Sequence, residues 1–148
     1  MIVWPIARYD PPPKHVLIMD DAIATRLLVR EILEEGGYRT SLAPATLDPD
    51  AITQIAPDVL ILDPMVGRGE DGWGLLRRLR EDPATARLPV VVCTGAVQRV
   101  RDEMESLATP DTELVLKPFD IDELLDAVDA LTRDAESPAG RDIAQIGD

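Results

Sequence analysis

The chain has 148 residues, which is enough for one domain with a substantial core and too few for two ordinary domains. Its apolar content of 45% is typical of a globular protein and excludes a largely disordered chain. The net charge of −13, from 28 acidic and 15 basic residues, repels a phosphate backbone and argues against direct nucleic-acid binding.

The sequence has none of the usual marks of a secreted or membrane-spanning chain. Its single cysteine, Cys93, cannot form an internal disulfide. The apolar start at residues 1–6 has no basic head and no small-residue cleavage site, and no run reaches the about 18 apolar residues of a membrane span. We therefore expect a cytoplasmic protein with no membrane partner.

Proline-rich segments mark the expected limits of the domain. The Asp-Pro-Pro-Pro run at 10–13 cannot join a helix or a central strand, because proline fixes φ and lacks an N–H donor. The Ser-Pro-Ala-Gly run at 137–140 breaks the last expected helix. We expect an N-terminal extension at 1–13, one domain at 14–134 and a flexible C-terminal tail at 135–148.

Short apolar runs alternate with amphipathic stretches along the domain. Uninterrupted runs of this kind predict parallel strands buried on both faces of a sheet. In chain order the predicted strands are Val16–Met19, a weaker strand at Tyr38–Ala43, Val59–Leu62, Val90–Cys93 and Leu114–Leu116.

Apolar residues three and four positions apart predict helices between these strands. The first helix ends at Gly36-Gly37, where glycine makes a positive φ available. The weakest helix lies near Asp48–Ile55. The other apolar stripes are Leu28, Val29, Ile32 and Leu33; Leu75, Leu76 and Leu79; Val97, Val100, Met104 and Leu107; and Ile121, Leu124, Leu125, Val128 and Leu131.

Five successive β–α units predict an α/β fold with a doubly wound, five-stranded parallel sheet. On this pattern alone, the Rossmann-like and the flavodoxin-like strand orders both remain open. In either order, ligands bind at the carboxyl ends of the strands, where the strand order reverses.

Polar residues follow four of the predicted strands at their carboxyl ends. They are Asp20, Asp21, Asp63, Thr94 and Lys117. In a parallel sheet these ends meet at one edge, so three carboxylates, a hydroxyl and an ammonium should share one cleft. Taken singly, each has an ordinary alternative as a helix cap, a turn residue or a solvated lysine. Their joint occurrence favours a site, and Lys117 is one of only two lysines in the chain.

This set of side chains suits metal-assisted phosphoryl chemistry. Three crowded carboxylates repel one another unless a cation enters, and oxygen ligands suit Mg²⁺. Such an ion neutralises phosphoryl oxygens so that a carboxylate can attack phosphorus. Lys117 and Thr94 would contact other phosphoryl oxygens, and Gly95 would leave room for the group.

From His15 to about Leu131 the chain resembles the receiver domain of bacterial two-component systems, including the chemotaxis regulators. The matching motifs are Asp20-Asp21, the segment from Pro57 to Asp63, Asp71-Gly72, Leu88-Pro89-Val90-Val91, Thr94-Gly95 and Lys117-Pro118-Phe119. The resemblance implies the flavodoxin-like strand order 2-1-3-4-5. It also implies that Asp63 is the phosphoacceptor, and that Thr94 and Lys117 sense the phosphoryl group.

The resemblance further implies a cofactor and partners. Mg²⁺ would be held by Asp20, Asp21, Asp63 and the backbone carbonyl of Met65. A histidine kinase or phosphotransfer protein would supply the phosphoryl group, a downstream effector protein would read it, and a homodimer is compatible with the family. Catalysis would be limited to the chain's own phosphorylation and dephosphorylation. With the small trans preference of bonds before proline, the resemblance also predicts a cis Lys117–Pro118 bond.

Two features depart from the usual receiver pattern. Gly67 stands where the family usually has a proline, Pro64 directly follows the acceptor, and Gly72 is the ninth rather than the eighth residue after it. Leu114 replaces the usual tyrosine or phenylalanine, so an aromatic switch is missing. These departures leave an alternative open, in which a pseudo-receiver acts as a protein-interaction module without regular phosphorylation.

A phosphatase with an aspartate nucleophile, similar to the haloacid dehalogenase group, is a further alternative that the residues disfavour. That group has a second aspartate two residues after its nucleophile. Here that place holds Met65 after Asp63, and Ala22 after Asp20.

Overall fold

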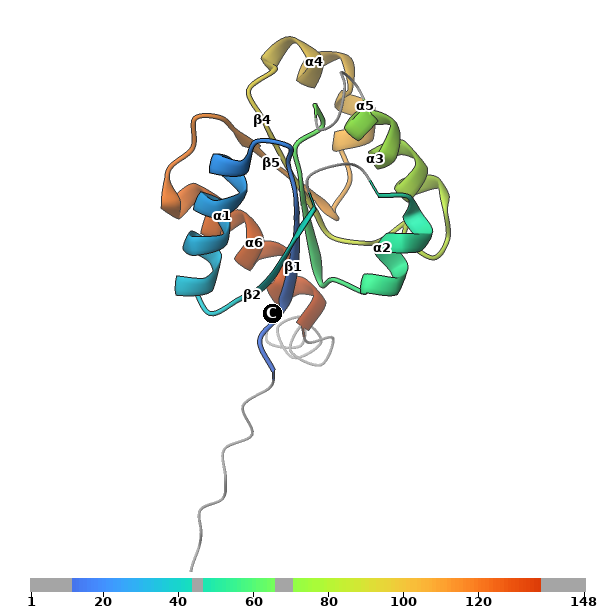
Figure 1. The fold of residues 1–148 in the computed structure, drawn as a ribbon. Helices are drawn as coiled ribbons and strands as arrows, with labels where there is room; N and C mark the ends of the chain where they lie inside the picture. Colours follow the sequence, from blue (N-terminus) through green and yellow to red (C-terminus); the bar gives the residue numbers. More distant parts are fainter. Residues whose placement is uncertain (1–11, 44–46, 66–70, 137–148) are drawn as a thin grey trace, which may run out of the picture.

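The chain folds into five β–α units around one parallel sheet (Figure 1). The computed structural model describes residues 12–43, 47–65 and 71–136. In chain order the elements are β1 (His15–Met19), α1 (Ile23–Glu35), β2 (Arg39–Ala43), α2 (Pro49–Ile55), β3 (Val59–Leu62), α3 (Asp71–Glu81), β4 (Val90–Thr94), α4 (Val97–Asp102), α5 (Met104–Leu107), β5 (Thr112–Leu116) and α6 (Ile121–Glu136).

The described strands form one five-stranded sheet in the order β2-β1-β3-β4-β5, with every neighbouring pair parallel. This confirms the flavodoxin-like order and excludes the Rossmann-like one. The chain crosses from β1 to β2 on one side and returns to β3 on the other, so the order reverses between β1 and β3. In register, Met19 pairs with Leu62, which places the residues that follow β1 and β3 side by side at one edge.

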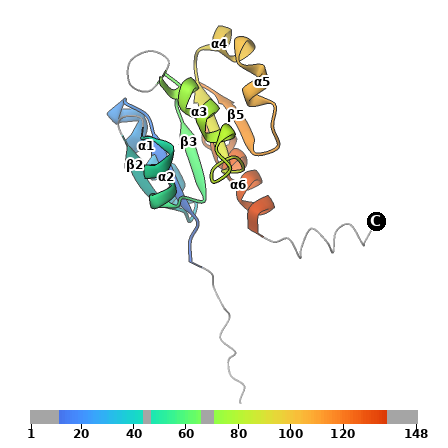
Figure 2. The same ribbon diagram turned by 90° about the vertical axis from the view of Figure 1, so that its right-hand side faces the viewer.

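Helices cover both faces of the sheet (Figure 2). Alternate strand residues point to opposite faces, so Leu17 and Met19 of β1 belong to one core, while Val16 and Ile18 belong to the other. The first core is closed by residues of α2, α3, α4 and α5, including the fully buried Trp73, and the second by α1 and α6. Burial of each large apolar side chain stabilises the fold by about 1.5–3 kcal/mol, which makes the sheet a rigid platform for its edge.

Local signals define the ends of α1 and α2. Gly37 adopts a φ of 94° after α1, as expected from the Gly36-Gly37 pair. The Asp48 side chain accepts a 2.8 Å hydrogen bond from the Ala51 amide at the start of α2. Ala56 ends that helix in the left-handed region, with a φ of 54°.

Two helix predictions were wrong in detail. The stripe that was expected to form one helix from Val97 to Leu107 is divided into α4 and α5, and Val97 is 48% exposed. The break falls at Glu103, whose carboxylate is held by Arg77 of α3 at 2.7 Å and by Arg99 at 3.1 Å. In α1, Leu28 was expected on the buried face but is 51% exposed. The helix instead packs through Val29, Ile32 and Leu33.

The Lys117–Pro118 peptide bond is cis, as predicted. Of the expected extension at 1–13 and tail at 135–148, only Pro12, Pro13, Ala135 and Glu136 are described. Ala135 and Glu136 belong to α6, so the helix runs two residues beyond the predicted domain end at 134. Within the described part of the chain, no helix combines the length and the apolar character needed to cross a bilayer.

Candidate functional site

The carboxyl edge of the sheet brings together residues from three strand ends. Lys117, which follows β5, donates from Nζ to Asp20 Oδ2 at 2.9 Å and to Asp63 Oδ2 at 3.1 Å. Asp20 and Asp63 follow the neighbouring strands β1 and β3, where the strand order reverses. Lys117, Asp20 and Asp63 therefore meet at the topological switch point, the place where ligands bind in open α/β sheets.

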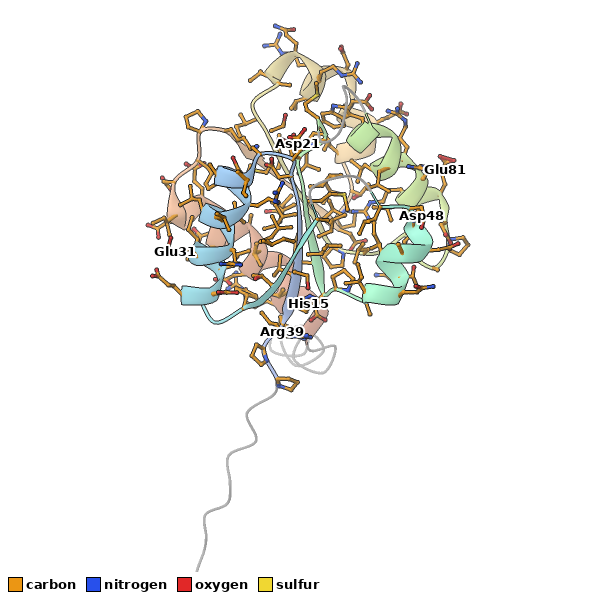
Figure 3. The ribbon with its side chains drawn as sticks, in the orientation of Figure 1. His15, Asp21, Glu31, Arg39, Asp48 and Glu81 are labelled. Carbon is orange, nitrogen blue, oxygen red and sulfur yellow. The ribbon has the colours of Figure 1, made fainter. Side chains whose placement is uncertain are left out.

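The three aspartates form a compact acidic cluster. One carboxylate oxygen each of Asp20, Asp21 and Asp63 lies within 4.8 Å of the other two. Asp20 is buried, Asp63 is partly buried and Asp21 is exposed, so the cluster opens to solvent on the Asp21 side. Figure 3 shows Asp21 at the upper end of the sheet, opposite His15 at the lower end. A cation could enter this cluster from solvent.

The loop after β1 holds Asp20 firmly. Its Oδ1 accepts a 2.9 Å hydrogen bond from the Ala22 amide, and its backbone carbonyl accepts a 2.7 Å bond from Arg26. The helix cap of α1 is Ala22 and makes no side-chain cap bond, so neither aspartate serves as the helix cap. The ordinary alternative for the Asp20-Asp21 pair is thereby removed.

Two hydrogen bonds hold Asp63 in place. Its amide donates to the Met19 carbonyl at 3.0 Å, and its Oδ1 accepts from the Met65 amide at 2.9 Å. The Met65 side chain is 37% exposed, and the loop 66–70 that contains Gly67 lies outside the described residues. The role expected for the Met65 carbonyl stays a prediction.

Gly72 makes the close contact that seats α3 against this loop. A methyl group on Gly72 would lie 2.4 Å from the Pro64 Cα and 2.5 Å from its carbonyl oxygen. No larger residue fits there without moving the backbone next to Asp63. The Asp71-Gly72 motif was noted in the sequence, but its contact with Pro64 depends on packing and could not be predicted.

Thr94 lies at the end of β4, beside β5, and is 1% exposed. Its Oγ1 accepts from the Ala96 amide at 3.0 Å, and its carbonyl accepts from the Lys117 amide at 2.8 Å. A Cβ on Gly95 would meet Lys117 only at ordinary contact distances of 3.7 and 3.8 Å. Packing against the described residues therefore does not require a glycine at this position.

Electrostatics favour the charged form of Lys117. Burial by itself lowers its pKa, but the hydrogen bond to Asp20 and the charge and hydrogen bond of Asp63 outweigh burial and raise the pKa above the usual lysine value. The ammonium therefore stays protonated at neutral pH and offsets part of the negative charge of the cluster. Among the described residues, Lys117 is the cation that forms ion pairs with Asp20 and Asp63.

Cys93 of β4 is buried, whereas Leu114 of β5 is exposed. Cys93 is 2% exposed, and burial raises the pKa of its thiol to about 12, so it is an inert core residue. Leu114 on β5 is 40% exposed and points away from the core. It occupies the position at which receivers usually have a tyrosine or phenylalanine. Arg26 was missed by the sequence analysis, because an arginine six residues after Asp20 carries no recognisable signal.

The comparisons with known proteins agree with this geometry. Residues 16–129 match the family model of the response regulator receiver domain. The DNA-binding dual master transcriptional regulator RpaA of Synechocystis sp. is 35% identical over 120 residues, which cover 80% of this chain and 49% of the regulator. Sporulation initiation phosphotransferase F of Bacillus subtilis is 32% identical over 116 residues, which cover 78% of this chain and 90% of the phosphotransferase.

Solved structures show the same fold. A putative response regulator from Chloroflexus aurantiacus superimposes with a TM-score of 0.69 at 28% identity, over 82% of this chain and 98% of that one. The chemotaxis response regulator CheY4 of Vibrio cholerae reaches a TM-score of 0.67 at 23% identity, over 80% of this chain and 98% of that one, and supports the fold alone. The chain spans about half of the length of RpaA and nearly all of the phosphotransferase. With the family model covering most of its length, the chain belongs to the response regulator receiver domain family.

Proposed function

We propose that this receiver domain accepts a phosphoryl group on Asp63, in a Mg²⁺-dependent reaction, as a step of a cytoplasmic two-component phosphorelay. The observation that carries the proposal is the bridge from Lys117 Nζ to both Asp20 and Asp63 inside the acidic cluster. It supplies the nucleophile, the metal-binding carboxylates and a cation for the incoming phosphate in one place.

The donor set fits Mg²⁺. The ligand atoms that the cluster offers are carboxylate oxygens, and Mg²⁺ binds through one or two carboxylates together with waters and phosphate. Asp20, Asp21 and Asp63 would hold the ion, with the Met65 carbonyl as a further ligand. When bound, the ion supplies positive charge that neutralises phosphoryl oxygens.

Asp63 would act as the nucleophile. One of its carboxylate oxygens attacks the phosphorus of the donor, a new O–P bond forms, and the bond to the donor's nitrogen or oxygen breaks with its electron pair leaving on the donor. Asp63 is held for this step by its amide bond to Met19 and by the Met65 amide. The product is an acyl phosphate, which water can hydrolyse to regenerate the carboxylate.

Lys117 and Thr94 would bind the transferred group. The Lys117 ammonium already contacts the acceptor carboxylate, so a small movement would bring it onto a phosphoryl oxygen. The Thr94 hydroxyl accepts from the Ala96 amide, which leaves its proton available for a second phosphoryl oxygen. Thr94 ends β4 and Lys117 directly follows β5. Movement of these two residues would therefore displace α4 and the β5 edge of the sheet.

The partners are proposed from the same surface. A histidine kinase or phosphotransfer protein would reach Asp63 past the exposed apolar residues Ile23, Leu27 and Leu28 of α1, which follow Asp21 along the chain. A downstream effector protein would read the phosphorylated state. A role as a pseudo-receiver is less well supported, because all five expected side chains are present and Lys117 contacts both Asp20 and Asp63.

Intact-mass spectrometry tests the proposal. The protein is incubated with a small acyl phosphate in the presence and absence of Mg²⁺. We expect a gain of one phosphoryl group that requires Mg²⁺ and is lost in Asp63→Asn. Asp102→Asn, which removes an exposed carboxylate at the end of α4, is the matched control and should behave like the parent. Equal labelling of Asp63→Asn, or no labelling of the parent, would overturn the proposal.

A further inference from the structure

A groove lies at the amino-terminal edge of the sheet, opposite the acidic cluster. It has a volume of about 440 Å³ and is formed by the end of α2, the start of β3 and the turn between α3 and β4. Its lining includes Thr53, Ala56, Pro57, Pro83, Ala84 and Arg87. Nothing in the proposed phosphoryl chemistry uses this part of the molecule.

The chemistry of the groove favours an apolar, aromatic occupant. The hydroxyl of Thr53 donates to the Pro49 carbonyl at 2.9 Å, and that of Thr85 donates to the Leu79 carbonyl at 2.8 Å, so both are committed within the fold. Among the described lining residues, Arg87 carries the charge. Proline rings and alanine methyls present flat apolar walls, and a guanidinium stacks well on an indole ring.

Residues 12–14, which lead into β1, lie near this groove. The described chain starts at Pro12, shortly before β1. The His15 amide donates to Asp58 Oδ2 and the Asp58 amide donates to the His15 carbonyl, both at 2.7 Å. Asp58 directly follows Pro57 of the groove, so the entry point of β1 and the groove are adjacent at the lower end of the sheet, where Figure 3 labels His15.

The preceding residues have the right composition and enough length. Residues 1–6 read Met-Ile-Val-Trp-Pro-Ile, which places one tryptophan among aliphatic residues. Eight residue steps separate Trp4 from Pro12 and can span up to about 26 Å, whereas neighbouring strands are only about 5 Å apart. A short tether gives an effective concentration in the millimolar range, so even a weak contact is populated.

We propose that residues 1–11 fold back onto the domain and that Trp4 occupies the groove between α2 and the α3–β4 turn. The apolar N-terminal segment thereby covers the edge of the sheet opposite Asp63. This contact is intramolecular and does not depend on the proposed phosphorylation, because the groove and the acidic cluster lie at opposite edges.

Acrylamide quenching of Trp4 fluorescence tests the contact in the full chain. Trp73 is fully buried, so a Trp73→Phe background leaves Trp4 as the single emitter. We expect a quenching constant several-fold lower than that of the same protein unfolded in urea. Thr53→Glu places a carboxylate in the groove and should restore the higher value. Gln54→Glu adds the same charge at an exposed position beside the groove and should change nothing.

A second measurement does not depend on the Trp73 substitution. Amide chemical shifts of the parent are compared with those of Trp4→Ala, and changes are expected at the residues that line the groove. The proposal would be overturned if the quenching constant of Trp4 equals that of the unfolded chain. It would also be overturned if the amide chemical shifts of the groove residues do not change in Trp4→Ala. Protection that disappears on dilution would also overturn it, because it would assign the groove to a second copy of the chain.

Discussion

Lys117 and Asp63 are in direct contact, with 3.1 Å between Nζ and Oδ2, although they are 54 positions apart and follow β5 and β3, with β4 between these strands. The same ammonium reaches Asp20 at 2.9 Å. The lysine therefore partly neutralises a cluster of three carboxylates before any cation or phosphate arrives.

Replacement of Lys117 should expose the repulsion within the cluster. With its side chain 26% exposed, the Lys117→Met change should lower the free energy of unfolding by on the order of 1 kcal/mol without Mg²⁺. Mg²⁺ should recover much of this loss. Lys14→Met, at the other lysine, should change stability by less than about 0.5 kcal/mol. Urea denaturation with and without Mg²⁺ measures both, and equal effects of the two substitutions would contradict a role for Lys117 in the cluster.

Mg²⁺ should stabilise the native protein. At about ten times its dissociation constant, a ligand that binds only the native state adds about 1.4 kcal/mol, or a rise in melting temperature of roughly 4 °C for a domain of this size. The rise should largely vanish in Asp21→Asn, which removes the exposed member of the cluster, and persist in Asp102→Asn. A thermal shift of the same size in Asp21→Asn would place the bound ion elsewhere.

Gly72 and Gly74 offer a matched pair of substitutions in α3. Gly72→Ala drives a methyl group to 2.4 Å from the Pro64 Cα and should destabilise the fold by about 1–3 kcal/mol. It should also slow phosphorylation, because Pro64 adjoins Asp63. Gly74→Ala meets nothing within 4 Å and should stabilise the helix by about 0.5–1 kcal/mol. Denaturation curves measure both effects; a neutral Gly72→Ala would show that the contact is not tight.

His15, the single histidine, should make stability fall in mild acid. Burial, followed by the charge of Arg39, lowers the pKa of His15 below 6.5, while Asp58 opposes this shift. Well above pH 6.5 the histidine is neutral in both states. As the pH falls below 6.5 the unfolded chain binds the proton first, so the free energy of unfolding decreases until the native pKa is passed. His15→Gln should flatten this part of the curve, and an NMR titration of the imidazole with a midpoint at or above 6.5 would contradict the mechanism.

Much of the fold and of the site could be predicted from the sequence, because local periodicity carries the information. Buried strands at Val59–Leu62 and elsewhere, and polar residues at their ends, place Asp20, Asp63 and Lys117 at one edge of any parallel sheet. The resemblance to a known family then selected the strand order, which periodicity alone left open.

The remaining features depend on long-range packing. The division of the helix after β4 involves Glu103 and its pairing with Arg77 of α3, 26 positions away. The contact of Gly72 with Pro64 and the full burial of Trp73 likewise arise only when α3 docks on the sheet. A stripe of apolar residues indicates which face of a helix is buried but does not show which member, such as Leu28, lies beyond the edge of the contact.

The central claim is that Asp63 receives the phosphoryl group. The most direct test is to treat the protein with Mg²⁺ and a small acyl phosphate, reduce the acyl phosphate with borohydride, which converts the modified aspartate to homoserine, and sequence the peptides by mass spectrometry. The expected result is homoserine at position 63 alone, formed only when Mg²⁺ is present. Homoserine at Asp20 or Asp21, or none at any of the three positions, would contradict the assignment of Asp63 as the phosphoacceptor.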